Sequence, residues 1–265
     1  MKKQLQYIVT LLLAVLLLCT SCAKLPAMDV KNGKYTNSKT GVTYFVAPSY
    51  YEAAAIKEES AVARIKHSET DDIVLYQIYD QAHKLDVPTD KYLATSNYEL
   101  FCVEGTRLPE LWEMGVESVY ITQSQAISIS LASITNEQEI ASLINNYRNG
   151  QSFDHSEIDP ALAFERYDLK FYSSAYPGIY YNVTYWHFDE DVLLYEDVED
   201  PNQFTPSYTD VEYSVHAYED GSGDYYVAYH FGTEILFNRS TGACVKAGET
   251  VKTYLDSIEN ETGAN

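Results

Sequence analysis

The stretch Tyr176–Trp186, YPGIYYNVTYW, is dense in tyrosine, of which the chain has 25, and it predicts a β-strand. Aromatic and β-branched residues favour strands, and a Pro-Gly turn precedes them here. Because strand side chains alternate, one face carries Ile179, Tyr181, Val183 and Tyr185, and the other carries Tyr180, Asn182, Thr184 and Trp186. The second face would be a binding surface if it is exposed, and part of the core if it packs between the sheet and a helix.

Further strands are expected on both sides of this stretch. A hairpin is predicted around the turn Lys39-Thr40-Gly41, between two β-prone runs. The other expected strands share β-branched and aromatic residues bounded by turn residues, and they are Ile73–Tyr79, Tyr98–Val103, Ser118–Thr122, Ala126–Ala132, Arg166–Ser173, Ile179–Phe188, Val211–Tyr218, Tyr225–Phe231, Glu234–Phe237 and Ala243–Lys246.

Helices are predicted in three places. Asn136–Asn149 has one apolar stripe, formed by Ile140, Leu143, Ile144 and Tyr147, and Thr135 stands at capping-box spacing from Gln138. Glu249–Ile258 repeats the same spacing of apolar residues. The Ala-rich stretch from Ser49 to His67 begins with a capping-box spacing and is also read as helical.

These elements predict an α+β fold, mostly antiparallel sheet with one amphipathic helix closing each half. The polar, turn-rich segment 149–161 divides residues 34–150 from a second half at 151–265. Strands that follow strands differ from the alternating βα pattern of periplasmic-type solute-binding proteins. They also disfavour a doubly wound or barrel α/β enzyme.

One hairpin can be predicted down to its register. A three-residue loop Gly221-Ser222-Gly223 places Ala217 opposite Val227 and matches the apolar faces of the two strands. The other face then carries Glu212, His216 and His230, a set that could bind a transition metal such as zinc. The alternative is the solvated face of an ordinary sheet.

The N-terminus has the parts of a secretory signal peptide. Two lysines are followed by the apolar run from Tyr7 to Leu18, which is too short for a membrane span of about 20 residues. The segment then ends in LLLCTSCAK, residues 16–24, with Ser21 before Cys22. A metal clip is disfavoured, because no further Cys or His lies at ligand spacing.

This ending resembles the lipobox of bacterial lipoproteins, although Cys19 occupies the position that is usually leucine. The resemblance implies that residues 1–21 are removed and that Cys22 is acylated as the first residue of the mature chain. A plain cleaved signal and an uncleaved anchor are the alternatives. Residues 22–33 would then tether the folded part to the extracytoplasmic face of the cell membrane.

Charge and cysteine content limit the partners. The chain has 39 acidic residues against 18 basic ones, a net charge of −21, which disfavours nucleic acid and anionic lipid surfaces. Cationic peptides, metal ions and neutral glycans remain open. Cys102 and Cys244 stand in apolar contexts, so they are either a disulfide, which the extracytoplasmic location permits, or two buried small residues.

No familiar catalytic motif is present, and no catalytic residue is assigned. The acidic loop Asp189–Asp200 could bind calcium weakly, or it could simply be solvated. The stretches YTNSKTGVTYFVAPSYYE and LFNRSTGACVKAG loosely resemble uncharacterised lipoproteins of gut-dwelling Gram-positive bacteria. That resemblance implies a location without a mechanism.

We therefore expect a lipid-anchored binding or interaction module of the cell envelope. Its ligand would be a glycan, a peptide or an envelope protein, held at a surface that includes Tyr180, Asn182 and Trp186. The alternative is an envelope hydrolase that acts on cell wall or glycan through the acids of 189–200 or the His216/His230 face.

Overall fold

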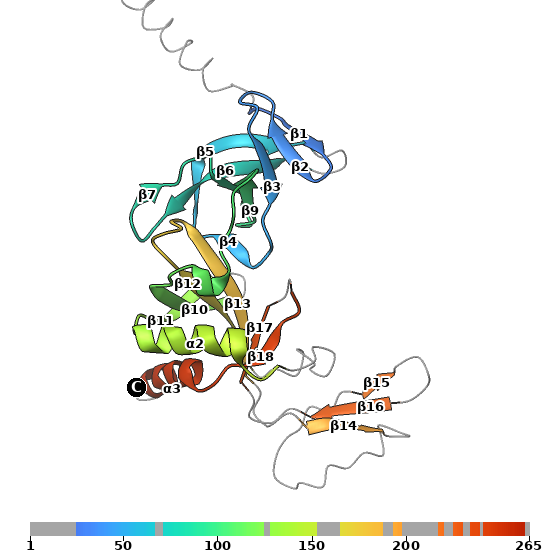
Figure 1. Ribbon diagram of the computed structural model, residues 1–265, viewed down its shortest axis with the longest axis vertical. Coiled ribbons are helices and arrows are strands. Elements are labelled where there is room, and N and C mark those ends of the chain that lie inside the picture. The colour runs from blue at the N-terminus through green and yellow to red at the C-terminus, as the bar shows by residue number, and fades with distance from the viewer. Residues whose placement is uncertain are drawn as a thin grey trace, which may run out of the picture.

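The computed structural model describes residues 25–66, 71–124, 128–152, 165–187, 193–197, 217–219, 225–229, 234–238 and 241–262. The fold is α+β and mostly antiparallel sheet, as expected. Two large sheets lie one above the other in Figure 1, and two helices lie beside the lower sheet.

The first sheet runs in the order β1–β2–β3–β9–β8–β6–β5, and β7 pairs with β6. These strands are β1 (Met28–Lys31), β2 (Lys34–Asn37), β3 (Thr43–Val46), β9 (Leu100–Val103), β8 (Tyr92–Ala94), β6 (Ile73–Asp80), β5 (Ile56–Ile65) and β7 (Leu85–Asp86). A parallel bridge from Ala27 to Arg64 brings the two ends of the sheet together. The sheet thus curls around a small core of its own, which includes Tyr44, Leu75 and Phe101.

The second sheet runs in the order β11–β10–β12–β13–β17–β18. Its strands are β11 (Ser128–Ile134), β10 (Ser118–Ser124), β12 (Glu165–Tyr172), β13 (Ile179–His187), β17 (Glu234–Phe237) and β18 (Cys244–Lys246). The short strand β4 (Tyr51–Ala53) leaves the first part of the chain and pairs with β13. A separate small sheet contains β14 (Leu193–Asp197), β16 (Tyr225–Tyr229) and β15 (Ala217–Glu219).

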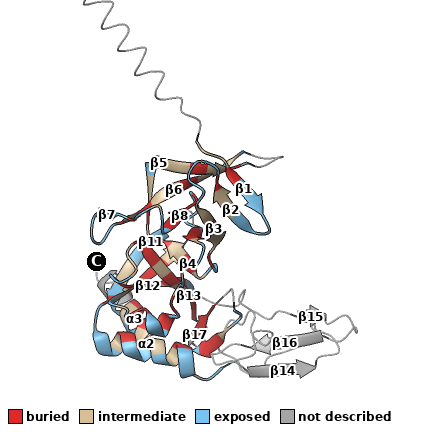
Figure 2. Ribbon diagram, turned by 45° about the horizontal axis from the view of Figure 1, so that its top comes forward, coloured by how far each residue is buried: buried red, intermediate tan, exposed pale blue. Residues whose placement is uncertain are grey.

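Both helices, α2 (Glu137–Asn149) and α3 (Thr250–Thr262), pack on one face of the second sheet (Figure 1). The sheet contributes Tyr181, Val183 and Tyr185 from one face of β13, and each is at most 2% exposed. The apolar stripe of α2 is buried against them, whereas its outer side is exposed (Figure 2). The second sheet therefore has one face closed by helices and one face left for other contacts.

Asn136 caps α2, one residue later than the predicted cap at Thr135. Its side-chain Oδ1 accepts from the backbone N–H of Gln138 at 2.9 Å and of Glu139 at 3.3 Å. An Asn side chain satisfies two free N–H groups of the first turn in this way, so the helix begins at Glu137.

Two hairpins are built from the same short pattern, Asn-x-x-Thr-Gly. In the β2–β3 hairpin, buried Asn37 accepts from the N–H of Lys39 and Thr40, and Gly41 takes φ +75°. In the β17–β18 hairpin, buried Asn238 accepts from the N–H of Thr241, and Gly242 takes φ +73°. The Asn side chain replaces backbone partners that the tight turn cannot supply, and glycine accepts the left-handed conformation.

Most expected strands are confirmed, and the small hairpin has the predicted register, with Ala217 opposite Val227. The prediction of a helix over 49–67 is wrong, because β4 and β5 occupy that stretch. In β5 the small residue Ala63 is fully buried opposite Leu75, and Ile65 is buried opposite Ile73. Alternation and β-branched residues thus outweigh the helix propensity of alanine.

The expected boundary near residue 150 falls inside the second sheet. Strands β10 and β11 and helix α2, all before that boundary, pair or pack with β12 and β13 after it. Strand β4 makes a further link, because it joins β13 from within the first part of the chain. One apolar core accordingly extends from Cys102 in the first sheet to Leu255 in α3.

Candidate functional site

The face of the second sheet opposite the helices is polar. Antiparallel register places Tyr120, Lys170 and Asn182 in one row across β10, β12 and β13, and places Thr122, Asp168 and Thr184 in the next row. All six come from the side of the strands that alternates with buried apolar residues. Such a surface offers hydroxyl, amide and charged groups on a rigid support.

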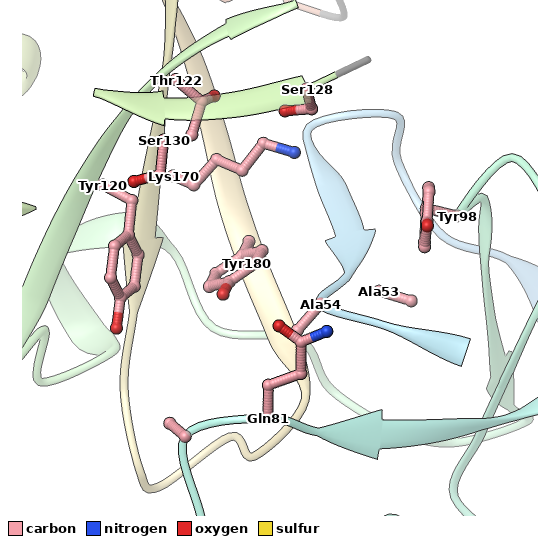
Figure 3. A pocket seen from close by; sticks show the side chains of 11 residues that line it. Ala53, Ala54, Gln81, Tyr98, Tyr120, Thr122, Ser128, Ser130, Lys170 and Tyr180 are labelled. Atoms are coloured by element: carbon pink, nitrogen blue, oxygen red, sulfur yellow. The ribbon is translucent and has the colours of Figure 1, made fainter. Parts of the chain in front are cut away.

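A cleft of about 440 Å³ lies between this face and the loops of the first sheet. The volume is within the range of about 300–1,000 Å³ that is typical of ligand pockets. Its walls combine aromatic, hydroxyl and amide groups with one cation, and the lining residues are Ala53, Ala54, Gln81, Ala82, Tyr98, Tyr120, Thr122, Ser128, Ser130, Lys170 and Tyr180. In Figure 3, Tyr180 and Lys170 stand between Tyr120 on one side and Tyr98 on the other.

Tyr180 is the central aromatic residue of the cleft. Its ring meets that of Tyr120 edge to face at 5.8 Å and that of Tyr172 at 6.0 Å. Burial, together with Tyr120 and Asp80, raises the pKa of Tyr180 to about 12. The phenol therefore stays protonated near neutral pH and can donate a hydrogen bond to a ligand.

Lys170 supplies the positive charge. Its Nζ donates to Glu52 Oε2 at 3.0 Å and lies 5.9 Å from the centre of the Tyr180 ring. The side chain is only 18% exposed, so much of its hydration has been replaced by these partners. The other oxygen of Glu52 accepts from Asn182 Nδ2 at 2.6 Å, which fixes the carboxylate beneath the cleft.

Tyr98 stands at the rim in a strained backbone conformation, with φ +64°. Its N–H donates to the carbonyl of Thr95, and its own carbonyl accepts from Ala53 N–H, both at 3.0 Å. These bonds hold the left-handed conformation, which is costly for an aromatic residue. The result is an aromatic side chain that is 45% exposed and faces the cleft.

Asp80, His83 and Tyr172 form a cluster next to the cleft residues Gln81 and Ala82. The Tyr172 hydroxyl donates to Asp80 Oδ2 at 2.9 Å, and His83 Nδ1 lies 2.7 Å from that hydroxyl and 3.1 Å from the same carboxylate oxygen. Burial raises the pKa of Asp80, but the hydrogen bonds from His83 and Tyr172 outweigh burial and bring the pKa below its usual value. The Asp80 carboxylate also accepts from the N–H groups of Ala82 and His83, so the cluster fixes this wall of the cleft.

A smaller cavity of about 160 Å³ lies on the same face of the sheet. It differs from the cleft in charge, because Glu52 and Asp168 both line it. Asn182 lines this smaller cavity and not the cleft. The polar face is thus divided into one compartment with a lysine and one with two carboxylates.

The predicted surface of Tyr180, Asn182 and Trp186 is only partly realised. Tyr180 lines the cleft and Asn182 the smaller cavity, but Trp186 is 2% exposed. Its ring stacks on Phe237 at 4.5 Å, because β17 pairs with the end of β13 and covers that position. The expectation of an exposed Trp186 is therefore wrong.

Sequence reasoning missed Tyr98, Tyr120 and Lys170. Tyr120 and Lys170 reach the cleft only through the pairing of β10 with β12, which a single sequence does not specify. The pattern that could have indicated Tyr98 is the polar turn Thr95-Ser96-Asn97 before it, in which the Thr95 hydroxyl accepts from Asn97 and Glu99 N–H.

The remaining candidate sites have different outcomes. Cys102 and Cys244 are both buried free thiols on different sheets, so the possible disulfide between them is not formed. Burial raises the pKa of each thiol to about 12. Cys22, Glu212, His216 and His230, and the side chains of the acidic loop 189–200, lie outside the described residues.

The described residues contain neither a candidate metal-binding group nor a candidate membrane span. Within these ranges no group of three or more His, Cys, Asp or Glu side chains is placed to hold a metal ion. Among the described helices, none is long and apolar enough to cross a membrane.

Comparison with known proteins leaves the cleft as the main guide to function. No protein-family model matches the chain, and neither the curated proteins nor the solved structures contain a match to it.

Proposed function

We propose that this protein is a lipid-anchored, extracytoplasmic binding module of the cell envelope, and that its ligand site is the cleft between the two sheets. The observation that carries the proposal is the cleft itself, in which Tyr98, Tyr120 and Tyr180 surround a cavity of about 440 Å³. Tyrosine combines a flat apolar ring with a hydroxyl, which suits it to sugars and peptides alike.

The proposed location at the cell membrane is inferred from the N-terminal sequence. The basic start, the apolar run and Ser21-Cys22 resemble a lipoprotein signal, so Cys22 would carry the anchor. Replacing Cys22 with serine should release the protein from the membrane fraction, because serine provides no sulfur for acylation. Retention of the Cys22→Ser protein in washed membranes would contradict a lipid anchor at Cys22.

The lining of the cleft favours binding over hydrolysis. Hydrolysis of glycans usually needs two carboxyl groups, one acid and one base or nucleophile. Among the described residues that line the cleft there is no Asp, Glu or His. The cleft accordingly supports recognition, and the envelope hydrolase remains the alternative, with its candidate residues in 189–200, His216 and His230.

The test is retention of the full-length protein on isolated cell wall. Tyr98→Ala removes the exposed rim aromatic, and Trp112→Ala is a matched control, because Trp112 is 39% exposed and lies outside the cleft. We expect Tyr98→Ala to reduce retention and Trp112→Ala to leave it unchanged. Release of soluble wall fragments by the purified protein would instead favour the hydrolase.

A further inference from the structure

The cleft differs in charge from the rest of the molecule. The chain carries a net charge of −21, yet the cleft is lined by one lysine and by no acidic residue among those described. On the same face of the sheet, the acids Glu52 and Asp168 are directed to the smaller cavity. Lys170 thus lines the cleft, whereas its ion-pair partner Glu52 lines the smaller cavity.

Lys170 has more hydrogen-bond donors than Glu52 engages. A lysine ammonium has three donors, and one of them is engaged by Glu52 Oε2. The Glu52 carboxylate also accepts from the neutral amide of Asn182, so its two oxygens are divided between two donors. An anionic group of a ligand could therefore take the remaining donors of Lys170, which lines the cleft and whose side chain is 18% exposed.

The other groups of the cleft suit a saccharide. Thr122, Ser128, Ser130 and the Gln81 amide provide donors and acceptors for hydroxyl groups, and the rings of Tyr120 and Tyr180 provide apolar faces. In Figure 3 these hydroxyls come from one wall, formed by β10 and β11, and Tyr98 stands on the opposite side. A pyranose ring has both hydroxyl edges and apolar faces, so it fits this combination.

We propose that the ligand of the cleft is an acidic saccharide, whose carboxylate binds Lys170 and whose ring packs on Tyr180. This inference rests on the proposed binding function and specifies its ligand class. The negative charge of the protein does not prevent it, because in physiological salt charges are screened beyond about 8 Å. The carboxylate closest to Lys170 is that of Glu52, at 3.0 Å, so a ligand carboxylate would share the ammonium with Glu52.

The test uses titration calorimetry of the full-length protein in detergent with trigalacturonic acid and with its methyl ester. The two probes have the same ring and differ in charge. We expect the acid to bind about tenfold more tightly than the ester, the effect of one charge-assisted hydrogen bond. Lys170→Gln should remove that preference, whereas Lys170→Arg should keep it.

Glu52→Gln provides a second variant with the opposite expected effect. It removes the carboxylate that competes for Lys170, so the acid should bind a few-fold more tightly than to the unmodified protein. Thermal unfolding of each variant checks that the fold survives. Because this variant increases binding, a loss of fold cannot imitate the result.

The possible failures are distinguishable. Equal affinity for acid and ester, or equal loss of both in Lys170→Gln, overturns the acidic ligand. Binding of neither probe, with wall retention that still depends on Tyr98, also overturns it but leaves the binding function intact. Wall retention that is indifferent to Tyr98 overturns the proposed function itself.

Discussion

Substitution of Gly178 by alanine tests whether the two sheets form one packed unit around the cleft. Gly178 has φ +74°, and an added Cβ would lie 2.7 Å from Val87 Cγ2 and 2.8 Å from Ile78 Cγ2. Both neighbours belong to the first part of the chain and are at most 1% exposed, so they have little room to move. The Gly178 carbonyl also accepts from Ala54 N–H at 2.8 Å, next to the cleft.

The expected cost has two components. A left-handed conformation costs a residue with a Cβ roughly 1–2 kcal/mol. Overpacking of a tight core typically adds about 1–3 kcal/mol. Gly41→Ala is the matched control, because Gly41 has φ +75° with nothing within 4 Å of the added Cβ. The difference between the two variants therefore isolates the contact between the sheets.

The assay is thermal unfolding of both variants and the unmodified protein. An additional loss of about 1–3 kcal/mol lowers the melting temperature by roughly 2–10 °C in a chain of this size. We expect Gly178→Ala to melt below Gly41→Ala by such an amount. Equal melting temperatures would refute the packing of the β12–β13 turn against Ile78 and Val87.

Three further variants test other contacts. Trp186→Ala should lower the free energy of unfolding by about 3–5 kcal/mol in denaturant titrations, because it empties a buried site, and the folded fraction should retain wall binding. Asn37→Ala should cost about 1–3 kcal/mol by the same measurement, since it leaves turn N–H groups without their acceptor, whereas Lys39→Ala should have little effect. Because the pKa of Asp80 is lowered in the folded state, its ionised form stabilises the fold above about pH 4, and this contribution disappears as the pH falls through the folded pKa. The melting temperature of Asp80→Asn should therefore fall less steeply on acidification than that of the unmodified protein. An unchanged acid profile would contradict the role of the Asp80–His83–Tyr172 cluster.

Local patterns predicted much of the fold because they reflect local physics. The alternation in Ile179–His187, the apolar stripe of α2 and the turn around Gly41 each depend on residues close in sequence. The register of the β15–β16 hairpin followed from matching apolar faces across a short loop.

The cleft could not be predicted in the same way because it depends on distant pairings. Tyr120 meets Tyr180 only because β12 lies between their strands, and Glu52 reaches Lys170 only because β4 crosses to β13. Trp186 was expected on the surface because the sequence of its own strand does not show that Phe237 stacks on it. The strand β5 was misread as helix because partner strands, not local propensity, decide such an alanine-rich stretch.

The central claim is that the ligand binds between the two sheets. Hydroxyl-radical footprinting, read by mass spectrometry, measures the oxidation of each tyrosine and tryptophan with and without solubilised cell-wall fragments. Binding in the cleft predicts protection of Tyr98, Tyr120 and Tyr180, and no change at Trp112, which is exposed outside the cleft. Protection of Trp112 with unchanged oxidation of the three tyrosines would contradict the account.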